Sequence, residues 1–410
     1  MNTNSPLSAP KRYAGFCGID IAKNKHVACV IDRDGNVVVK SQTFTNDAAG
    51  YQQILTRLKE AGGPRKITVA MEATGHYWYS LHDFLVRNRY HVAVLNPIQT
   101  AQQAKKSIRK SKTDRIDARH IATLIKNGEG RPAIIPGELG MNCRQLTRLH
   151  HNMVRQESRI KQMIWSWLHP VWPEYEPLFV APFCKTGRVL LRTAPTPSDI
   201  IDMSEEDLYE LIRKTSRGKF GRSRANKIHQ AAESSIGMHR GLAATRICIR
   251  LLIDQLEALK PIRQQLETEI QTLANQLPGY MFTLPGISAA SAVSLFGETD
   301  PIDAFSSPSQ LVAFAGLDPA VSQSGEPAAQ EPARHISKRG SPFLRKTLWL
   351  MTFRALQQDG ELRDYWLRKR RQGTHHLAAV TATAVKLCRA TWRILIDRRD
   401  YLPQQPITKH

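Results

Sequence analysis

The sequence predicts two kinds of structure in turn, a mixed α/β domain at the N-terminus and an all-α remainder. Between residues 13 and 95, short apolar runs of strand length alternate with amphipathic segments. From residue 141 onward, apolar residues recur at the steps of three and four that are typical of helices. A chain of 410 residues also exceeds the size of a usual single core, so we expect two or three domains.

The first elements are three predicted strands. Strand-like runs cover residues 13–22, 26–32 and 37–43. The turn between the second and third runs contains Asp34 followed by Gly35, a pair that is typical of tight hairpins. We therefore expect a meander of three antiparallel strands.

Five further elements complete the predicted domain. In order they are a helix at 47–60, a strand at 67–73, a helix at 77–87, a strand at 91–95 and a basic helix at 107–125. Three strands followed by helix, strand, helix, strand and helix is the element order of the ribonuclease H fold. The sequence therefore predicts a ribonuclease-H-like domain at residues 13–131.

Four acidic residues stand out in this domain. Asp20 and Glu72 are each a lone acid in an apolar strand, between small residues that leave room for a ligand. Asp114 and Asp117 lie three apart in the basic helix, so their side chains share one helical face. A single strand carboxylate is more often a hydrogen-bonded structural residue, but four acids in this element order favour a metal site.

Two-metal phosphoryl transfer explains why such acids would be needed. Acids on adjacent strands and a crossing helix can hold two cations about 4 Å apart, which activate the attacking oxygen and stabilise the leaving oxygen. We expect Mg²⁺, or Mn²⁺ in its place, at Asp20, Glu72, Asp114 and Asp117. Taken alone, two acids spaced in this way on a basic helix more often belong to a solvated surface with ordinary ion pairs than to a metal site.

The charge balance predicts a nucleic-acid partner. The chain has 58 Lys and Arg against 36 Asp and Glu, a formal charge of +22. It has no apolar run of membrane-spanning length and no signal-like start, so we expect no membrane and a cytoplasmic location. The six cysteines are scattered singly along the chain, so we expect neither a structural zinc site nor a disulfide framework.

Candidate contacts to nucleic-acid phosphates form two clusters, although solvated surface is the commoner fate of basic runs. The cluster around the acids consists of Lys105, Lys106, Arg109, Lys110, Lys112 and Arg115. The cluster toward the C-terminus consists of Lys338, Arg339, Arg345 and Lys346.

A linker at residues 132–140 leads to a predicted helical region at 141–277. Apolar residues from Leu252 to Leu277 follow the alternating three and four steps of a heptad seam. The seam predicts a helical hairpin or a coiled coil between chains, and an ordinary core stripe inside one domain fits the spacing as well. Residues 178–236 are predicted to form a compact helical insert with a basic run at 214–227.

A C-terminal domain is predicted at residues 278–400, with loose tails at 1–12 and 401–410. It opens with LPGIS at 284–288, a Pro-Gly turn that suits a helix-hairpin-helix gripping one phosphate through backbone N–H groups. Helical hairpins also end in this way for packing alone. Further along, a loop rich in small residues leads to a basic helix capped by Ser341.

The motifs also resemble those of a known family. GIDIAKNKHVACVIDRDGNVV, VAMEATGHYW and NPIQTAQQAKKSIRKSKTDRIDARHIA closely resemble segments of the DEDD transposases of the insertion-sequence-110 family. The N-terminal domain of that family is similar to the RuvC junction resolvases, and the four acids match its metal ligands one by one. The resemblance implies a recombinase of a mobile element that breaks and rejoins DNA strands.

The resemblance extends to a serine. The family carries a nucleophilic serine in an S-G loop ahead of an I-S-K-x-G segment, and Ser324, followed by Gly325 and by the ISKRG segment at 336–340, matches that position. It implies a covalent phosphoserine intermediate, in which Lys338, Arg339 or their neighbours could stabilise charge. Ser322 stands two residues away as an alternative. Without the resemblance, Ser324 would be read as an ordinary loop hydroxyl.

The family likeness also implies partners. They are donor and target double-stranded DNA and a structured non-coding bridge RNA that pairs with both; a nucleoid-associated prokaryotic protein would fit. A homodimer or dimer of dimers is expected on other grounds, because the heptad seam is a natural dimer contact and strand exchange needs at least two catalytic centres. Two alternatives stay open. A RuvC-like junction nuclease without RNA would use water and not need Ser324. A non-catalytic nucleic-acid-binding protein would gain nothing from four carboxylates facing phosphates.

Overall fold

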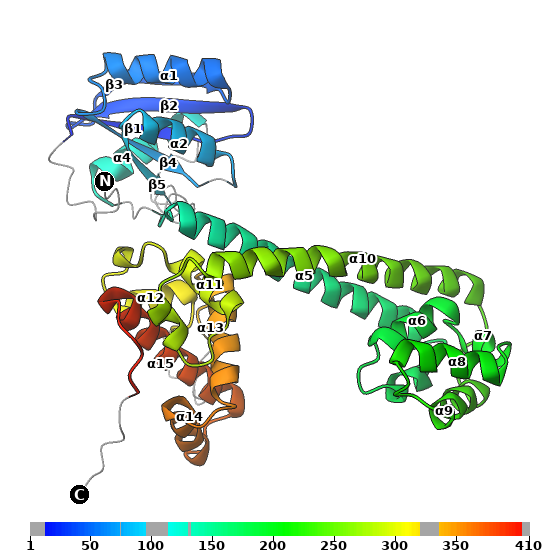
Figure 1. The fold of residues 1–410 in the computed structure, drawn as a ribbon. Helices are drawn as coiled ribbons and strands as arrows, with labels where there is room; N and C mark the ends of the chain where they lie inside the picture. Colours follow the sequence, from blue (N-terminus) through cyan, green and yellow to red (C-terminus); the bar gives the residue numbers. More distant parts are fainter. Residues whose placement is uncertain (1–12, 74, 96–113, 130–132, 320–335, 404–410) are drawn as a thin grey trace, which may run out of the picture. The chain divides into compact units, whose positions relative to one another are not determined.

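The computed structural model describes residues 13–73, 75–95, 114–129, 133–319 and 336–403. The chain forms two compact units, residues 1–135 and 136–410, each with its own hydrophobic core. The predicted order of a mixed α/β domain followed by helices is confirmed (Figure 1). Among the described helices, none combines the length and the apolar character that crossing a membrane requires.

The first unit is built on a five-stranded sheet. Its strands are β1 (Gly15–Asp20), β2 (Lys25–Asp32), β3 (Val37–Thr45), β4 (Ile67–Glu72) and β5 (His91–Leu95). Their order across the sheet is β3-β2-β1-β4-β5. The meander β1-β2-β3 is antiparallel, as the Asp34-Gly35 turn predicts, whereas β4 runs parallel to both β1 and β5.

Helices cover both faces of this sheet. They are α1 (Ala48–Glu60), α2 (Trp78–Arg87) and α4 (Asp114–Lys126). The side chains of α1 and α2 share one core with alternate strand residues such as Cys17 and Ile19, while α4 shares a second core with the intervening residues such as Phe16 and Ala70. Figure 1 shows α1 and α4 on opposite sides of the sheet. Strands β1, β2 and β4 are therefore buried on both faces, which accounts for their apolar sequences, whereas the edge strand β3 is largely exposed.

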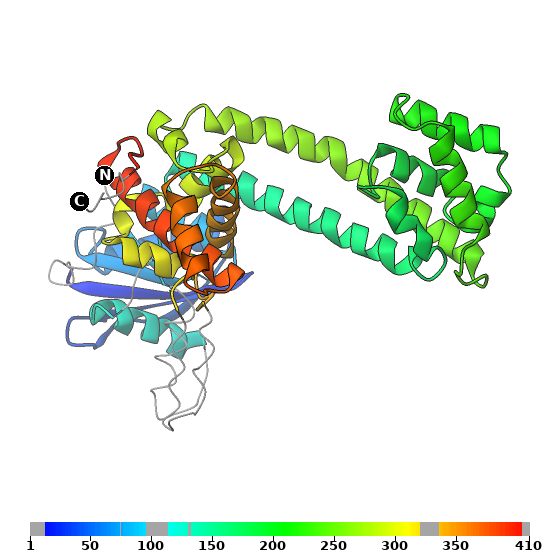
Figure 2. The ribbon, with the colours of Figure 1, turned by 90° about the horizontal axis from the view of Figure 1, so that it is seen from below.

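The second unit contains a long antiparallel helical hairpin. Its arms are α5 (Glu138–Leu168) and α10 (Leu242–Ala274), which pack along each other. At the far end lies a small lobe made of η2 (Pro173–Leu178), α6 (Lys185–Thr193), α7 (Pro197–Ile201), α8 (Glu205–Ser216) and α9 (Arg222–Glu233). Figure 2 shows the two arms side by side with the lobe at one end. We call this lobe the hairpin lobe.

The heptad seam lies inside the chain. Leu252, Leu256, Leu266 and Ile270 of α10 are buried, and α5 is the helix that packs along α10. Of the structures that the seam predicted, the helical hairpin is therefore the one that forms. These residues are covered by the same chain, so they do not argue for a contact between chains.

The other described elements of the second unit lie at the opposite end of the hairpin from the lobe. They are η3 (Gly279–Thr283), α11 (Ala289–Thr299), η4 (Ile302–Ala304), α12 (Pro308–Ala315), α13 (Pro342–Ala355), α14 (Glu361–Arg371) and α15 (His376–Asp397). In the LPGIS turn, Gly286 has φ +70°, and a Cβ there would lie 2.0 Å from the carbonyl oxygen of Met351. The turn thus packs directly on α13.

Candidate active site

Asp20 and Glu72 end two neighbouring strands on the same face of the sheet. The strands β1 and β4 pair in parallel, with Ile19 opposite Met71, so the next residues in this register are Asp20 and Glu72. Both side chains are partly buried. Because parallel strands end at the same edge, the two carboxylates are presented together there.

Helix α4 crosses β1 just before that edge. A Cβ on Gly18 would lie 2.1 Å from the carbonyl oxygen of Ala118 and 2.4 Å from the amide nitrogen of Ala122. Only glycine permits this close approach, since any side chain would push the helix off the strand. Gly18 and Asp20 lie on the same face of β1, so α4 packs on the face that carries the acids.

The N-terminal end of α4 is the end nearer to the acids. Lys126, the last residue of α4, has its Nζ 3.4 Å from the Cβ position of Gly35, and Gly35 lies in the turn that adjoins the start of β1. The helix therefore runs in the opposite direction to β1, and its first residues lie at the end of β1 that carries Asp20. Asp117 is partly buried and precedes Ala118, the residue that touches Gly18.

Asp114 is the first residue of α4 by its backbone, but its side chain lies outside the described residues, as does that of Arg115. Within the part of the chain that is described, no three His, Cys, Asp or Glu side chains are grouped so as to hold a metal ion. Asp20, Glu72 and Asp117, which come from two strands and the crossing helix, are therefore not brought close enough together to form such a group of three.

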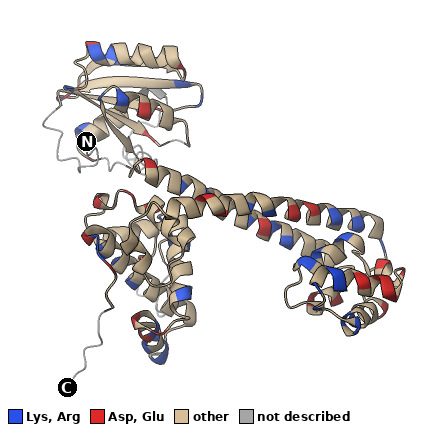
Figure 3. Ribbon diagram, in the orientation of Figure 1, with Lys and Arg blue, Asp and Glu red and all other residues tan. Residues whose placement is uncertain are grey.

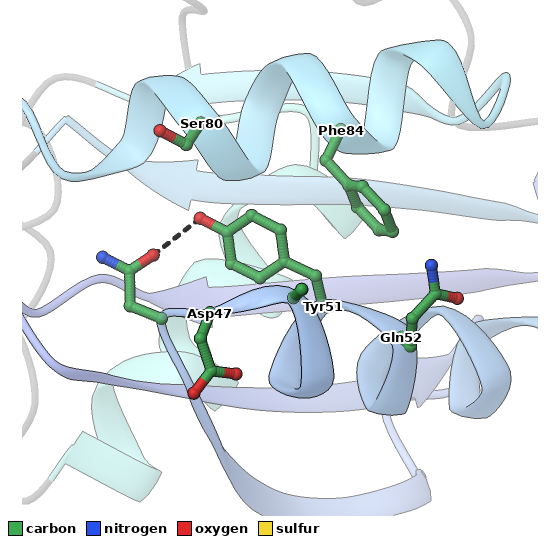
Figure 4. A pocket seen from close by; sticks show the side chains of 7 residues that line it. Asp47, Tyr51, Gln52, Ser80 and Phe84 are labelled. Carbon is green, nitrogen blue, oxygen red and sulfur yellow. Dashed lines mark hydrogen bonds between the residues drawn. The ribbon is translucent and has the colours of Figure 1, made fainter.

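A pocket in the same unit lies on the other face of the sheet. It has a volume of about 440 Å³ and lies between α1 and α2, with Tyr51, Ser80 and Phe84 in its wall. The Tyr51 hydroxyl donates to Asn46 Oδ1 at 2.6 Å. Figure 4 shows Tyr51, Ser80 and Phe84 around the pocket. Because α1 and α2 cover the face opposite α4, this pocket is separate from the acids.

Comparison with known proteins identifies the family. A transposase model of the DEDD type found in IS110 elements matches residues 17–173, and a model described as transposase IS116/IS110/IS902 family matches residues 280–367. Together they cover more than half of the chain. The chain belongs to the IS110 family of transposases. It is therefore an insertion-sequence transposase, and its substrate is DNA.

Several relatives resemble the transposase along most of its length. The 44.8 kDa protein of insertion element IS116 from Streptomyces clavuligerus is 24% identical over 96% of this chain and 98% of its own. The transposase for insertion sequence element IS1111A from Coxiella burnetii is 23% identical over 94% and 90%. The pilin gene-inverting protein of Moraxella bovis is 31% identical, over 25% of this chain and 31% of its own.

The transposase's expected serine lies outside the described residues. Neither Ser324 nor Ser322 is described, and the same holds for Lys105, Lys106, Arg109, Lys110 and Lys112. The described backbone on either side of residues 320–335 is joined. Pro319 and Ile336 form a β-bridge, and the Ser337 amide donates to the Asp318 carbonyl at 2.8 Å. The Ser337 hydroxyl also donates to Asp318 Oδ1.

The four predicted cations next to this bridge differ in surroundings. Lys338 and Arg339 are exposed, and Lys338 has φ +54° while its amide donates to the Gly316 carbonyl at 3.2 Å. Arg345 donates to the Ala315 carbonyl at 3.1 Å, so it supports the fold near the bridge. Burial and the nearby Arg155 lower the pKa of Lys346. Lys338 and Arg339 are thus the members most open to a phosphate.

Sequence reasoning missed a buried charge network beside this region. Glu298 of α11 is fully buried and accepts from Arg148 Nε at 2.7 Å and Nη2 at 3.0 Å. It also accepts from the Ser341 hydroxyl at 2.8 Å, and Ser341 caps α13. A lone glutamate in the otherwise uncharged segment SAASAVSLFGE was the available signal. The network fixes α5, α11 and α13 to one another.

His151 lies close to this network. Its ring packs against Phe343, with 5.7 Å between ring centroids, and Arg148 lies over the same Phe343 ring at 4.8 Å. Burial, together with the cations Lys346 and Arg155, lowers the pKa of His151 to about 4. The imidazole is therefore neutral at physiological pH, which suits a site already rich in positive charge.

Proposed function

We propose that this transposase cuts and rejoins DNA strands by metal-assisted phosphoryl transfer at the edge formed by β1, β4 and α4, and that its first unit is ribonuclease-H-like. The observation that supports this most strongly is the matching position of Asp20 and Glu72 at the ends of parallel strands, with Asp117 on the helix that crosses them. The sheet order β3-β2-β1-β4-β5 supports the fold assignment.

The donor set fits a hard cation. Asp20, Glu72 and Asp117 carry oxygen ligands of the kind that Mg²⁺ and Mn²⁺ prefer, and Asp114 would add a fourth; the three described side chains do not form a ligand group by themselves, so binding would have to draw them together. Bound Mg²⁺ would lower the pKa of an attacking hydroxyl and neutralise charge on the leaving oxygen. The role of this chain's acids would be to fix the cation, while the partly buried strand ends exclude part of the bulk water.

Metal binding tests this donor set without reference to activity. Calorimetric titration of the full chain with Mg²⁺ should show binding that Asp20→Ala or Glu72→Ala weakens by at least about tenfold, since each removes a charged ligand. Glu60→Ala is the matched control, because Glu60 is an exposed acid of the same unit at the end of α1. Equal Mg²⁺ affinity in all four proteins would refute the site.

The proposed nucleophile is Ser324. Its oxygen would attack the phosphorus, a serine–phosphate bond would form, and the bond to the deoxyribose oxygen would break; the serine proton passes to a base and the leaving oxygen gains a proton. The likeness of Ser324 and the following ISKRG segment to the family pattern supports this choice. A stalled reaction should leave a covalent protein–DNA adduct that Ser324→Ala abolishes and Ser322→Ala retains. The reverse pattern would move the nucleophile to Ser322.

A bridge RNA would supply site selection. The chain is strongly basic, and the sequence contains no zinc module and no helix-turn-helix that we can place, so sequence choice by base pairing fits with the protein reading shape and backbone. Recombination at a specific site should then require an RNA encoded beside the gene. Ribonuclease-treated protein that kept full site-specific activity would exclude this role, and adding the RNA back is the matching control.

A further inference from the structure

The last turn of α14 carries four consecutive cations, Arg368, Lys369, Arg370 and Arg371, which we call the α14 cluster. Arg368, Arg370 and Arg371 are exposed and Lys369 is partly exposed. Arg370 donates to the Thr374 carbonyl at 2.7 Å, which closes the turn into α15. Among the described residues, no ion pair joins any of the four to a carboxylate.

The sequence that follows the α14 cluster contains no acid for many residues. From residue 365 to residue 396 the sequence has seven Lys and Arg and no Asp or Glu. The acids of α14, Glu361 and Asp364, lie in its first turn, and Glu361 pairs with Lys386. The helix dipole favours cations at a helix C-terminus, which helps α14 to hold this much like charge.

The basic run of the hairpin lobe provides a contrast within the same chain. There Arg222 forms a bidentate pair with Glu206, at 2.6 and 2.9 Å, and Arg213 pairs with Glu210 at 3.2 Å. The helix before it begins with three acids in its first turn. Figure 3 shows both colours of charge on this lobe, whereas α14 ends in Lys and Arg alone. The basic run of the hairpin lobe is therefore accompanied by acids that pair with its cations, whereas the α14 cluster is not.

Aromatic rings near the α14 cluster are already occupied. Arg368 and Lys369 lie 5.4 and 5.9 Å from the centre of the Tyr365 ring, and Lys386 lies 5.3 Å from it. Trp366 packs edge-on against His376 at 5.8 Å. Single-stranded nucleic acid is held by bases stacked on open rings, which these residues do not offer, whereas a duplex presents phosphates.

We propose that the α14 cluster binds the phosphate backbone of double-stranded DNA, independently of sequence, as an anchor separate from the acids of the first unit. This deepens the transposase assignment and rests on it for the DNA substrate. The match to the second family model ends at residue 367, immediately before the cluster. The cluster would add affinity and leave site selection to other parts of the complex.

Duplex binding at varied salt tests the anchor. The full chain, in the absence of divalent cations so that no strand is cut, is titrated with a short duplex of arbitrary sequence between about 50 and 200 mM salt. The test variant combines Arg368→Gln, Lys369→Gln and Arg371→Gln. It keeps Arg370, because that residue closes the turn. Each lost phosphate contact should lower the slope of log affinity against log salt by about 1, so the combined variant should lose about 2 to 3.

The matched control removes the same charge from the hairpin lobe. Lys214→Gln, Lys219→Gln and Lys227→Gln change three exposed cations of a lobe that also carries acids, and this variant should keep the wild-type slope within about 1. Arg368→Lys with Arg371→Lys retains the charge and should restore the slope, which guards against a folding defect in the first variant. Unchanged duplex binding in the α14 variant would overturn the anchor, and so would a loss confined to an RNA hairpin. The assay measures binding without cleavage, so failure of the acidic site would not alter its outcome.

Discussion

Gly18 of β1 and Ala118 of α4 are in such close contact that a Cβ on Gly18 would approach the Ala118 carbonyl oxygen to 2.1 Å. Asp20 and Asp117 are near neighbours of these two residues in sequence, so this contact fixes how close their backbones lie. A backbone contact thus sets the spacing of β1 and α4 next to the candidate site.

Replacing Gly18 with Ala should destabilise the first unit and displace α4. Overpacking of this kind costs about 1–3 kcal/mol in the free energy of unfolding, and the backbone atoms involved cannot rotate away. Chemical denaturation followed by circular dichroism would measure the loss. Gly279→Ala is the control, since nothing lies within 4 Å of its Cβ position. Equal stability of the two variants would contradict the close packing.

Removing Arg148 should cost more than removing an exposed partner. Arg148→Leu leaves Glu298 buried without its cation, and breaking a buried pair in this way costs about 3 kcal/mol or more. Because the Arg148 side chain is 39% exposed, Glu298→Gln leaves a guanidinium that water can reach and should cost less. Arg57→Ala, which breaks an exposed pair with Glu60, should change stability by less than about 1 kcal/mol. Thermal unfolding of the three variants provides the comparison, and an equal loss in all three would be inconsistent with the network.

The neutral state of His151 predicts a pH dependence of stability. Its pKa falls from 6.5 to about 4 on folding, so the unfolded chain binds the proton more readily. The contribution of His151 to the free energy of unfolding is fully present above about pH 6.5 and is lost as the pH falls toward 4. The melting temperature of the wild type should therefore drop over this range more than that of His151→Gln. If the melting temperatures of the two proteins fell equally with pH, His151 would not be the cause of the pH dependence. Burial also lowers the pKa values of His26, His82 and His91, but these residues are present in both proteins and so do not affect the comparison.

We also expect the working site to be shared between chains, in a homodimer or dimer of dimers. The acids belong to the first unit and Ser324 to the second, and exchange of strands needs at least two centres. Mixing Asp20→Ala protein with Ser324→Ala protein should restore part of the cleavage that each lacks alone. Native mass spectrometry must show that mixed oligomers form. If they form and no cleavage returns, serine and acids act within one chain.

Local signals in the sequence predicted most of the first unit. The turn at Asp34-Gly35 and the short run His91–Leu95 define their elements by residue type alone, and both are observed. The parallel pairing of Ile19 with Met71 depends on contacts between distant segments, so the sequence could suggest it only through the element order. The helical hairpin shows the same limit, because heptad spacing does not say which helix covers it. Glu298 was missed for this reason too, since its partner Arg148 lies 150 residues away.

The rate of strand cleavage by acid variants measures whether the acids at the ends of β1 and β4 take part in the reaction. With the full chain, its DNA, the RNA and Mg²⁺ present, Asp20→Ala should cut at the background rate while it still binds the duplex, because the positive surface is intact. Asp83→Ala, which removes an exposed acid of α2 that pairs with Arg87, should cut as the wild type does. Cleavage by Asp20→Ala at the wild-type rate would contradict the account.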